Sequence, residues 1–587
     1  MKKFLLLTCF LLLSVCNILY AKPALEYRIN GIEDPLKENA LSWLQIEQKQ
    51  LGEPLTQEKI QILMQKAPED IKGALSPYGY FEPSISSKVI TLRDGTQVAE
   101  FTINPGKPVK INNVEISVTG AGAKLKPFQQ YLKQFPIKSG QILNTEDYNT
   151  QKKNLTNIAT DAGFLAGKFT QSQIRVNLKT HQADIILEFN TGPQYYFGQV
   201  HFSPNPMDDA FLRRYLKFKP GQPYSPDALM TLQQDLSSTK YFRSVSVEPR
   251  QQNSTNQQVP VDVNLTAGKY SQYNFGLGYG TDTGVRATVG WDLNRITPTG
   301  QYFTSYLQLS QVQSSLAAQY NIPGQNPLTQ NYFWGASVFQ QSFNSSNGFT
   351  QKVFIGLTDQ FWGWQTTLTL NQQFDQYDLR EGPKQYTHLL LPSVTFLKSK
   401  ADDPIFPRRG YSVSLNLRGA AKELLSSSSF LQSELSGKYI FSPTKRSRVV
   451  TRGNLGVTGT GDIEKVPLSL QFFAGGAESI RGYDYQELGP GKYLVVGSLE
   501  YQYEVKKNWF ATIFTDTGNA VNSFSNPQDN VVGKNEPSID LSDTLKYSVG
   551  IGALWASPVG PMELTLAKPL SDPGKKPMIQ FTMGASL

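Results

Sequence analysis

Residues in the second half of the chain alternate between apolar and polar types with a period of two. The segment at 411–418, YSVSLNLR, places Tyr, Val and two Leu on one side and Ser, Ser, Asn and Arg on the other. The segment at 579–587, IQFTMGASL, repeats the pattern. Successive side chains of a strand point to opposite faces, so these segments predict strands with one apolar and one polar face. Apolar-out, polar-in alternation is typical of a transmembrane antiparallel β-barrel.

The barrel pattern begins near Tyr270, where charged residues thin out and helical periodicity disappears. The about 319 residues of 269–587, at roughly 20 per strand with its connection, predict about 16 strands. Aromatic clusters at 332–334 and 361–364 are typical of the girdles at membrane interfaces. A soluble β-sandwich or propeller is the alternative, and the alternation that persists to the last residue disfavours it.

Residues 22–268 contain a weak threefold repeat with a period of about 80 residues. Each copy has a glycine before a helix, then a capping residue (Thr56, Thr145 or Ser225), and each copy reads strand, helix, helix, strand, strand. The predicted organisation is a signal peptide at 1–21, repeats at 22–106, 107–192 and 193–268, and a barrel at 269–587. The repeats are either inert α+β spacers or a periplasmic arm whose exposed sheet edges bind extended peptides.

The N-terminal segment is typical of a secretory signal peptide. Lys2 and Lys3 precede an apolar run at 4–13, and cleavage is expected after Ala21. Both cysteines lie inside this segment, so we expect a mature chain without disulfides or cysteine–metal sites. The net charge of +8 falls to about +6 with the loss of the two lysines. The rest of the sequence contains no run of 18 apolar residues, so no spanning helix is predicted.

The stretch Phe472–Pro490 reads FFAGGAESIRGYDYQELGP and differs from the strands around it. Its glycine pair marks backbone that turns tightly, and Arg481-Gly482-Tyr483 combines a planar guanidinium with a neighbouring ring. In the strand that follows, Glu500 lies on the polar face, and Asp516 lies on the matching face of the strand after that. A solvated surface arginine is the alternative reading of an isolated RGY.

These segments resemble a known family. The repeats look like POTRA (polypeptide-transport-associated) domains, and the C-terminal half looks like the 16-stranded barrel of outer-membrane protein insertases and translocases. Four segments match the patterns of that superfamily in order: ADDPIFPRRG at 401–410, the glycine pair with RGY at 473–483, FTDTG at 514–518, and the G-x-G, P-x-G-P and A-x-P-L series at 547–570. The resemblance implies that Arg481 folds into the barrel lumen and pairs with Glu500 and Asp516.

Among the subfamilies, BamA-type insertases carry five POTRA domains, and two-partner secretion transporters carry two with a plug helix. Three repeats and this length look most like TamA, the outer-membrane subunit of translocation and assembly modules. That resemblance implies a TamB-like periplasmic partner, unfolded outer-membrane protein clients such as autotransporters, and a part in outer-membrane lipid homeostasis. A two-partner-secretion-type transporter, or a passive outer-membrane pore or receptor, is the alternative.

No pattern in the chain indicates catalysis. The histidines are His181, His201 and His388, and no HExxH, G-x-S-x-G or phosphate-binding glycine loop is present. We therefore expect no enzyme activity, no cofactor and no metal site. Lysine and arginine alternate with acids along the chain, so nucleic acid is not an expected partner either.

Glycines predict a weak lateral seam where the barrel closes. Gly276, Gly278 and Gly280 share one face of the first strand, and Gly584 lies near the end of the last. Glycine weakens a strand because it costs backbone entropy and leaves nothing to pack against neighbours. The alternative is that these glycines make room for the Arg481 loop.

Overall fold

The computed structural model describes residues 25–52, 55–93, 96–281, 283–343, 346–378, 382–523, 545–558 and 560–583. The predicted signal peptide and Gly584 lie outside these residues. The chain divides into two compact units: residues 1–201 with 218–230 and 249–262, and residues 202–217 with 231–248 and 263–587. The boundary runs through the third predicted repeat. No helix in the described part of the chain is long and apolar enough to cross a membrane.

The order strand, helix, helix, strand, strand is confirmed in all three repeats. The elements are β1 Leu25–Asn30, α1 Leu36–Leu51, α2 Gln57–Leu75, β2 Ser84–Thr91 and β3 Gln97–Asn104; β4 Lys110–Thr119, α3 Lys126–Lys133, α4 Thr145–Asp161, β5 Lys168–Asn177 and β6 Gln182–Asn190; β7 Tyr196–Phe202, α5 Asp209–Leu212, α6 Pro226–Ser237, β8 Phe242–Pro249 and β9 Gln258–Ala267. In each sheet the last strand lies in the middle: β1-β3-β2, β4-β6-β5 and β7-β9-β8.

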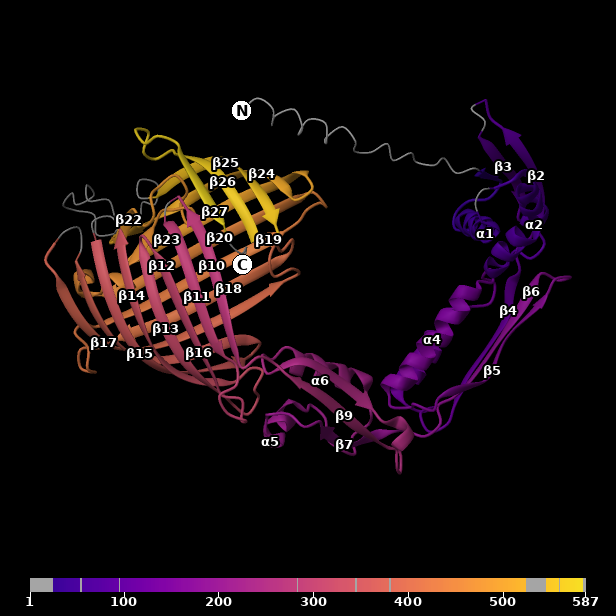
Figure 1. Cartoon of the computed structure of the whole chain (residues 1–587), viewed down its shortest axis with the longest axis horizontal. Coiled ribbons are helices and arrows are strands. Elements are labelled where there is room, and N and C mark those ends of the chain that lie inside the picture. Colours follow the sequence, from indigo (N-terminus) through magenta and orange to yellow (C-terminus); the bar gives the residue numbers. More distant parts are fainter. Residues whose placement is uncertain are drawn as a thin grey trace, which may run out of the picture. The chain divides into compact units, whose positions relative to one another are not determined.

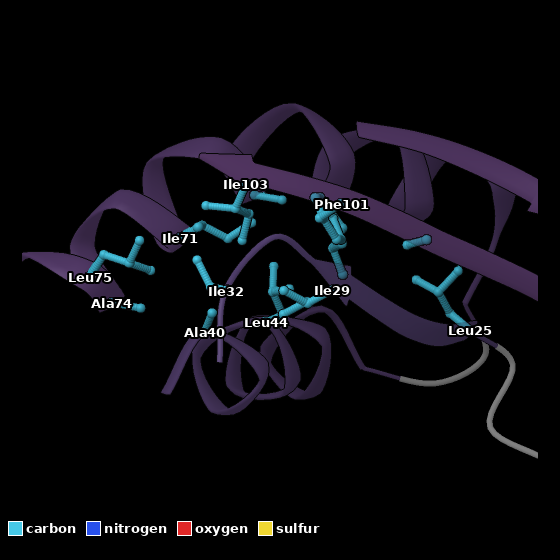
Figure 2. Close-up of a cluster of buried hydrophobic side chains, with 13 residues drawn as sticks. Leu25, Ile29, Ile32, Ala40, Leu44, Ile71, Ala74, Leu75, Phe101 and Ile103 are labelled. Atoms are coloured by element: carbon cyan, nitrogen blue, oxygen red, sulfur yellow. The ribbon is translucent and has the colours of Figure 1, made fainter. Parts of the chain in front are cut away.

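The first repeat packs two helices on one face of its sheet. Leu44 of α1 and Ile71 of α2 are fully buried against Phe101 of β3, and Figure 2 shows these side chains pointing toward one another. The Thr56 side chain caps α2 by accepting a hydrogen bond from the backbone nitrogen of Lys59 at 3.3 Å. Burial of the apolar helix faces therefore holds this small sheet.

The predicted cap at Thr145 is wrong by one residue. Thr145 is the first residue of α4, and Asn144 is the cap, with its side-chain oxygen accepting from the backbone nitrogen of Glu146 at 2.9 Å. Asn144 has the extended backbone of a cap residue, and asparagine caps a helix at least as well as threonine.

Successive repeats of the first unit join through equivalent glycines. Gly79 has a φ of 85° and its carbonyl accepts from the backbone nitrogen of Val109 at 2.8 Å. Gly163 has a φ of 84° and its carbonyl accepts from Tyr195 at 2.7 Å. A Cβ on Gly79 would lie 2.8 Å from the carbonyl oxygen of Leu143, so the joint itself requires glycine.

The second half forms a 16-stranded antiparallel sheet in sequence order, as predicted, and Figure 1 shows its strands side by side around the barrel. Its strands are β10 Ser271–Gly280, β11 Gly284–Leu293, β12 Tyr302–Ser310, β13 Gln313–Pro323, β14 Asn331–Phe343, β15 Ser346–Phe361, β16 Trp364–Asp378, β17 Gln385–Ala401, β18 Gly410–Ala420, β19 Phe430–Phe441, β20 Ser447–Thr460, β23 Tyr493–Lys506, β24 Trp509–Val521, β25 Lys546–Ser557, β26 Gly560–Pro569 and β27 Met578–Met583. A short ribbon of β21 Phe472–Ala474 and β22 Leu488–Gly491 is separate from this sheet.

The predicted faces of the barrel strands are confirmed. In β23 the even-numbered residues 494–502 are buried, whereas Leu499, Tyr501 and Tyr503 are exposed on the outside. Aromatic residues gather where β14 and β24 begin and where β13 and β25 end, which is one end of the antiparallel barrel. Stacked pairs there include Tyr320 with Trp334 and Trp509 with Trp555. The apolar outer face and this aromatic ring match a membrane-embedded barrel.

Within the second unit, the third repeat contacts the barrel turns at this same end. The Tyr241 hydroxyl donates to the carbonyl of Gly300 at 2.6 Å, and the Pro298 carbonyl accepts from the backbone nitrogen of Asp208 at 3.0 Å. Lys240 pairs with Asp292 of β11 at 2.8 Å. These contacts tie the repeat to the turn between β11 and β12.

Candidate functional site

The connection between β20 and β23, residues 461–492, is the lumen loop. It carries two 3₁₀ turns, Ile463–Lys465 and Leu468–Leu470, and then the β21–β22 ribbon with the Arg481 segment between its strands. Its side chains contact inward-facing residues of several barrel strands. The loop therefore lies inside the barrel.

Arg481 is 2% exposed and sits between two acids of the barrel wall. Its Nε and Nη2 lie 2.8 and 2.9 Å from the two carboxylate oxygens of Asp516, and its Nη1 lies 2.5 Å from Glu500. Its Cζ stacks 3.3 Å from the centroid of the Phe514 ring. This arrangement combines a bidentate charge-assisted pair with a cation–π contact, and the guanidinium stays charged in it.

The wall completes the hydrogen bonding of these acids. Ser498 donates to Asp516 at 2.7 Å, and the backbone nitrogen of Arg481 donates to the same carboxylate at 3.0 Å. Gln502 donates to Glu500 at 2.5 Å. Arg481 alone does not balance the two carboxylates, and Arg452 of β20, which donates to Ser498 at 3.2 Å, brings a second positive charge to the site. Buried carboxylates are tolerated where opposite charge and hydrogen bonds are both supplied.

Gly482 and Tyr483 bind the last strands of the barrel. Gly482 has a φ of 90°, and a Cβ there would lie 3.0 Å from the ring of Pro569 at the end of β26. Its backbone nitrogen donates to the Gln580 side chain at 3.0 Å, and Gln580 in turn donates to the carbonyl of Tyr483 at 3.2 Å. The RGY segment is thus bound to β23 and β24 through its charge and to β27 through its backbone.

Two residues of this site escaped the sequence analysis. Glu563 of β26 lies 3.8 Å from Arg481, and Gln580 of β27 is 1% exposed. Both are polar residues at inward-facing positions of strands in which polar and apolar residues alternate, and this alternation is the sequence signal that could have identified them. Alternation predicts that a side chain faces the lumen. It does not predict that the side chain contacts the RGY segment, because that depends on where the loop lies.

Tyr483, the last residue of the RGY segment, contacts a polar group in the connection between β26 and β27. Its hydroxyl donates to Asp572 at 2.8 Å, and Lys546 pairs with the same carboxylate at 2.8 Å. The hydrogen bond from Lys546, followed by that from Tyr483, holds the pKa of the Asp572 carboxyl below its usual range.

The other end of the loop packs on the opposite set of strands. Ser469 donates to Asp375 of β16 at 2.9 Å, and Gln432 of β19 donates to the carbonyl of Leu470 at 2.7 Å. Val466 and Leu470 are buried in an apolar cluster inside the barrel, together with Leu389, Leu391 and Phe430. The sequence analysis missed this second attachment.

The turn between β17 and β18 carries the first matching motif, and it folds onto the barrel interior. Asp402 accepts from the backbone nitrogens of Arg408 and Arg409 at 2.9 and 3.1 Å. Phe406 packs against the Arg448 guanidinium, 4.2 Å from the ring centroid. Arg448 also donates to the carbonyl of Pro407 at 2.8 Å, so the turn is anchored at that end of the barrel.

The predicted seam lies where β10 and β27 meet. In the described residues no strand ladder joins them. The contacts there include a hydrogen bond of 3.0 Å from the backbone nitrogen of Phe581 to the Thr281 hydroxyl, and the rings of Tyr279 and Phe581, whose centroids lie 6.4 Å apart. Cβ atoms on Gly276 and Gly278 would meet Thr288 and Arg286 of β11, at 2.4 and 3.9 Å, rather than the lumen loop. Both readings of these glycines, a weak seam and room for the Arg481 loop, stay predictions.

Residues 255–587 match the model of the Omp85 superfamily domain, which covers more than half of the chain. The chain belongs to the Omp85 superfamily. Two further matches fall on the repeats: residues 26–105 match POTRA domain TamA domain 1, and residues 195–268 match a POTRA model described as a surface antigen variable number repeat. The protein is therefore an outer-membrane β-barrel with N-terminal POTRA domains.

Two curated relatives are similar over most of the chain. The outer membrane protein assembly factor BamA of Neisseria meningitidis is 21% identical over 89% of this chain and 73% of that protein. BamA of Neorickettsia risticii is 22% identical over 84% of this chain and 68% of that protein. The crystal structure of Haemophilus ducreyi BamA lacking POTRA domains 1–3 has a TM-score of 0.66 at 18% identity, covering 81% of this chain and 99% of that one. That likeness shows the shared fold.

In the described residues, no group of three or more His, Cys, Asp or Glu side chains is placed to hold a metal ion. Family members are assembly and transport factors, and the residues of the site act by ion pairing and hydrogen bonding.

Proposed function

We propose that this chain is an assembly factor that inserts or secretes outer-membrane proteins, with autotransporters among its clients and a TamB-like protein as its periplasmic partner. The observation that carries the proposal is a combination of two features. Residues 271–281 and 578–583 form no strand ladder with each other, and the lumen loop binds β27 through Gln580. The proposal includes the repeat boundaries at 106, 192 and 268.

The seam provides the route for clients. An edge strand offers a row of unpaired backbone groups, and a client strand can add to it. Along β10, the apolar side chains Phe275 and Leu277 are 78% and 79% exposed, so a pairing strand would enter from the membrane side. The BamA relatives are named as outer membrane protein assembly factors, which agrees with this route.

In this proposal the repeats have different roles. The first repeat matches the model of the first TamA POTRA domain and is the expected contact of the TamB-like partner. Deletion of residues 22–106 should leave a folded barrel that no longer retains this partner in a pull-down. Loss of the barrel itself on that deletion would count against this division.

A disulfide across the seam tests the route. Thr281→Cys with Phe581→Cys places the new thiols where the two strands already touch, and the mature sequence has no other cysteine. The oxidised protein in vesicles should stay folded but stop assembling an unfolded autotransporter barrel, and reduction should restore assembly. Each single-cysteine variant is the control. Normal assembly by a fully oxidised barrel would exclude the lateral seam as the route.

The competing functions are a two-partner-secretion-type transporter and a passive pore or receptor. Planar-bilayer recordings separate the last of these from an assembly factor, because an occupied lumen predicts small and irregular conductance. A large, steady conductance would favour the pore. Export of a soluble partner protein without its membrane insertion would favour the secretion transporter.

A further inference from the structure

The barrel wall has a second discontinuity, eight strands from the seam. The ladder between β17 and β18 runs from Ala401–Gly410 only as far as Ser393–Arg418. The ladder between β17 and β16 continues to Tyr377–Gln385. The first eight residues of β17, 385–392, therefore lie beyond the ladder with β18, while the ladder with β16 continues to Gln385.

Pro392 explains where the ladder stops. The backbone nitrogens of His388 and Leu390 donate toward the loop that follows β18, at 3.0 and 2.9 Å. Successive strand residues direct their backbone groups to alternate sides, so residue 392 should donate to β18 as well. Proline has no N–H, and the ladder ends at the next residue.

The connection between β18 and β19, residues 421–429, replaces the missing strand contacts. Ser426 and Ser427 accept from Leu390 and His388, and the backbone nitrogen of Ser427 donates to the carbonyl of His388 at 2.8 Å. These groups of β17 are therefore satisfied without another strand. An incoming protein strand would have to displace both serines.

An apolar groove of about 730 Å³ lies over this discontinuity. Its lining includes Leu368, Leu370, Leu390, Pro392, Leu424 and Leu431. Leu370 and Leu431 are 41% and 69% exposed on the lipid-facing side, so the groove is continuous with the outer surface of the barrel. The charged lining residue, Arg418, donates to Gln432 at 2.5 Å and lies 3.8 Å from Glu434.

The groove extends from the middle of the apolar band into the outer leaflet. Six residues of β17 separate Pro392 from Lys398, whose ammonium lies 5.6 Å from the Trp364 ring at the repeat-side edge of the band. At about 3.3 Å per residue and a tilt of about 40°, they cover roughly 15 Å of an apolar band about 25 Å tall, so Pro392 lies just past the middle and Ser426, bonded to Leu390, lies farther out. Leu424 and Leu425 of the connection are 64% and 74% exposed beside this level. Exposed leucines at this depth suit hydrocarbon rather than water.

We propose that this groove binds an acyl chain of an outer-leaflet lipid, with residues 421–429 as one wall of the site. The volume lies within the ~300–1,000 Å³ of small-ligand sites. The lining is apolar and the nearby backbone groups of β17 are already hydrogen-bonded, so the groove binds hydrocarbon through apolar contacts. The site rests on the barrel's place in the membrane and not on the proposed function.

The test uses the full mature chain in phosphatidylcholine vesicles that contain a phosphatidylcholine with a photoactivatable diazirine in its acyl chain. After illumination, lipid adducts are mapped on peptides by mass spectrometry. Peptides covering 385–394 and 417–431 should carry at least threefold more adduct than those of β12, another lipid-facing strand. Uniform labelling of all lipid-facing strands would overturn the proposal.

A groove-filling variant makes the test specific. Leu370→Trp should reduce labelling of the groove peptides to the level of β12, while Leu309→Trp on β12 should leave it unchanged, and both should keep the heat-resistant barrel band on gels. If Leu370→Trp does not fold, Leu431→Trp fills the groove from β19. Enrichment that survives filling would overturn the site. If an unfolded barrel protein displaces the lipid adducts and cross-links to 385–392, the groove binds a strand and the lipid proposal is wrong.

Discussion

Replacing Arg481 with alanine should release the lumen loop from the wall, and the cost can be worked from the contacts. The substitution removes two hydrogen bonds to Asp516, of 2.8 and 2.9 Å, and one of 2.5 Å to Glu500. Breaking a buried ion pair by removing one partner costs about 3–5 kcal/mol, because a buried charge is left without its counter-charge. Asp516 keeps Ser498 and Glu500 keeps Gln502, so we expect the lower end, about 3 kcal/mol.

Hydrogen exchange of the loop amides at 475–487 measures this quantity directly, since it reports the free energy of local opening. A loss of about 3 kcal/mol corresponds to roughly 150-fold faster exchange. Lys465→Ala is the matched control, because it removes an ion pair with Asp462 of 2.7 Å in the same loop where both side chains are about half exposed. Exposed pairs contribute about 0–1 kcal/mol, so exchange should rise less than about fivefold.

Two further variants separate charge from geometry. Arg481→Lys keeps the charge but loses the planar fork, and its loop should exchange at a rate between those of the wild type and Arg481→Ala. Adding Glu500→Gln and Asp516→Asn to Arg481→Ala should recover part of the loss, because two of the three carboxylates beside Arg481 are then neutral. Exchange in Arg481→Ala that matches the Lys465→Ala control would refute the reasoning. A triple variant that is worse than Arg481→Ala would refute the role given to unpaired charge.

Three other substitutions test neighbouring contacts. Gly482→Ala should cost about 1–2 kcal/mol of loop docking because of its φ of 90° and the 3.0 Å approach to Pro569, read as exchange about 5- to 30-fold faster than in the wild type. The lowered pKa of Asp572 means that its contacts stabilise loop docking above the ordinary carboxyl pKa of about 4 and lose this effect as the pH falls below it, so protease cleavage of the loop should increase in acid. Asp572→Asn should abolish this acid-induced increase in cleavage. An unchanged acid response in Asp572→Asn would exclude this residue as its cause. Tyr241→Phe should leave the buried carbonyl of Gly300 without its donor, at a cost of about 1–3 kcal/mol, and exchange of the 294–301 turn should increase while that of β12 does not.

The period of two predicted the barrel and the inward faces of Glu500 and Asp516, and the family resemblance implied that Arg481 pairs with them. Glu500 and Asp516 occupy the polar face of strands whose alternation is regular, and both line the lumen beside Arg481. The repeats were equally readable, since each copy has the same glycine, helix and strand order. Local patterns decide these features, and tertiary contacts do not override them.

The remaining contacts depend on the path of the lumen loop, which no local pattern encodes. Gln580 lies 98 residues from Gly482 in sequence, and Ser469 lies 94 residues from Asp375. Val466 and Leu470 also look like ordinary loop residues until the apolar inward positions on β17 and β19 are known. Pro392 was not singled out from the sequence, and which neighbour a proline in a strand leaves unpaired depends on the register.

The lumen loop links the two halves of the barrel wall, and this bears on how the seam is held. One end of the loop is fixed to β16 and β19 through Asp375 and Gln432, and the other is fixed to β23 and β24 through Arg481. Gln580 binds the backbone of the RGY segment on the inside of β27, while the edge of β27 has no described ladder to β10. The loop therefore holds the last strand from the inside, through Gln580, in addition to its ladder with β26. Since the same segment carries Arg481, loosening the ion pair should also loosen β27, and the seam and the charged site should respond together to any substitution in either.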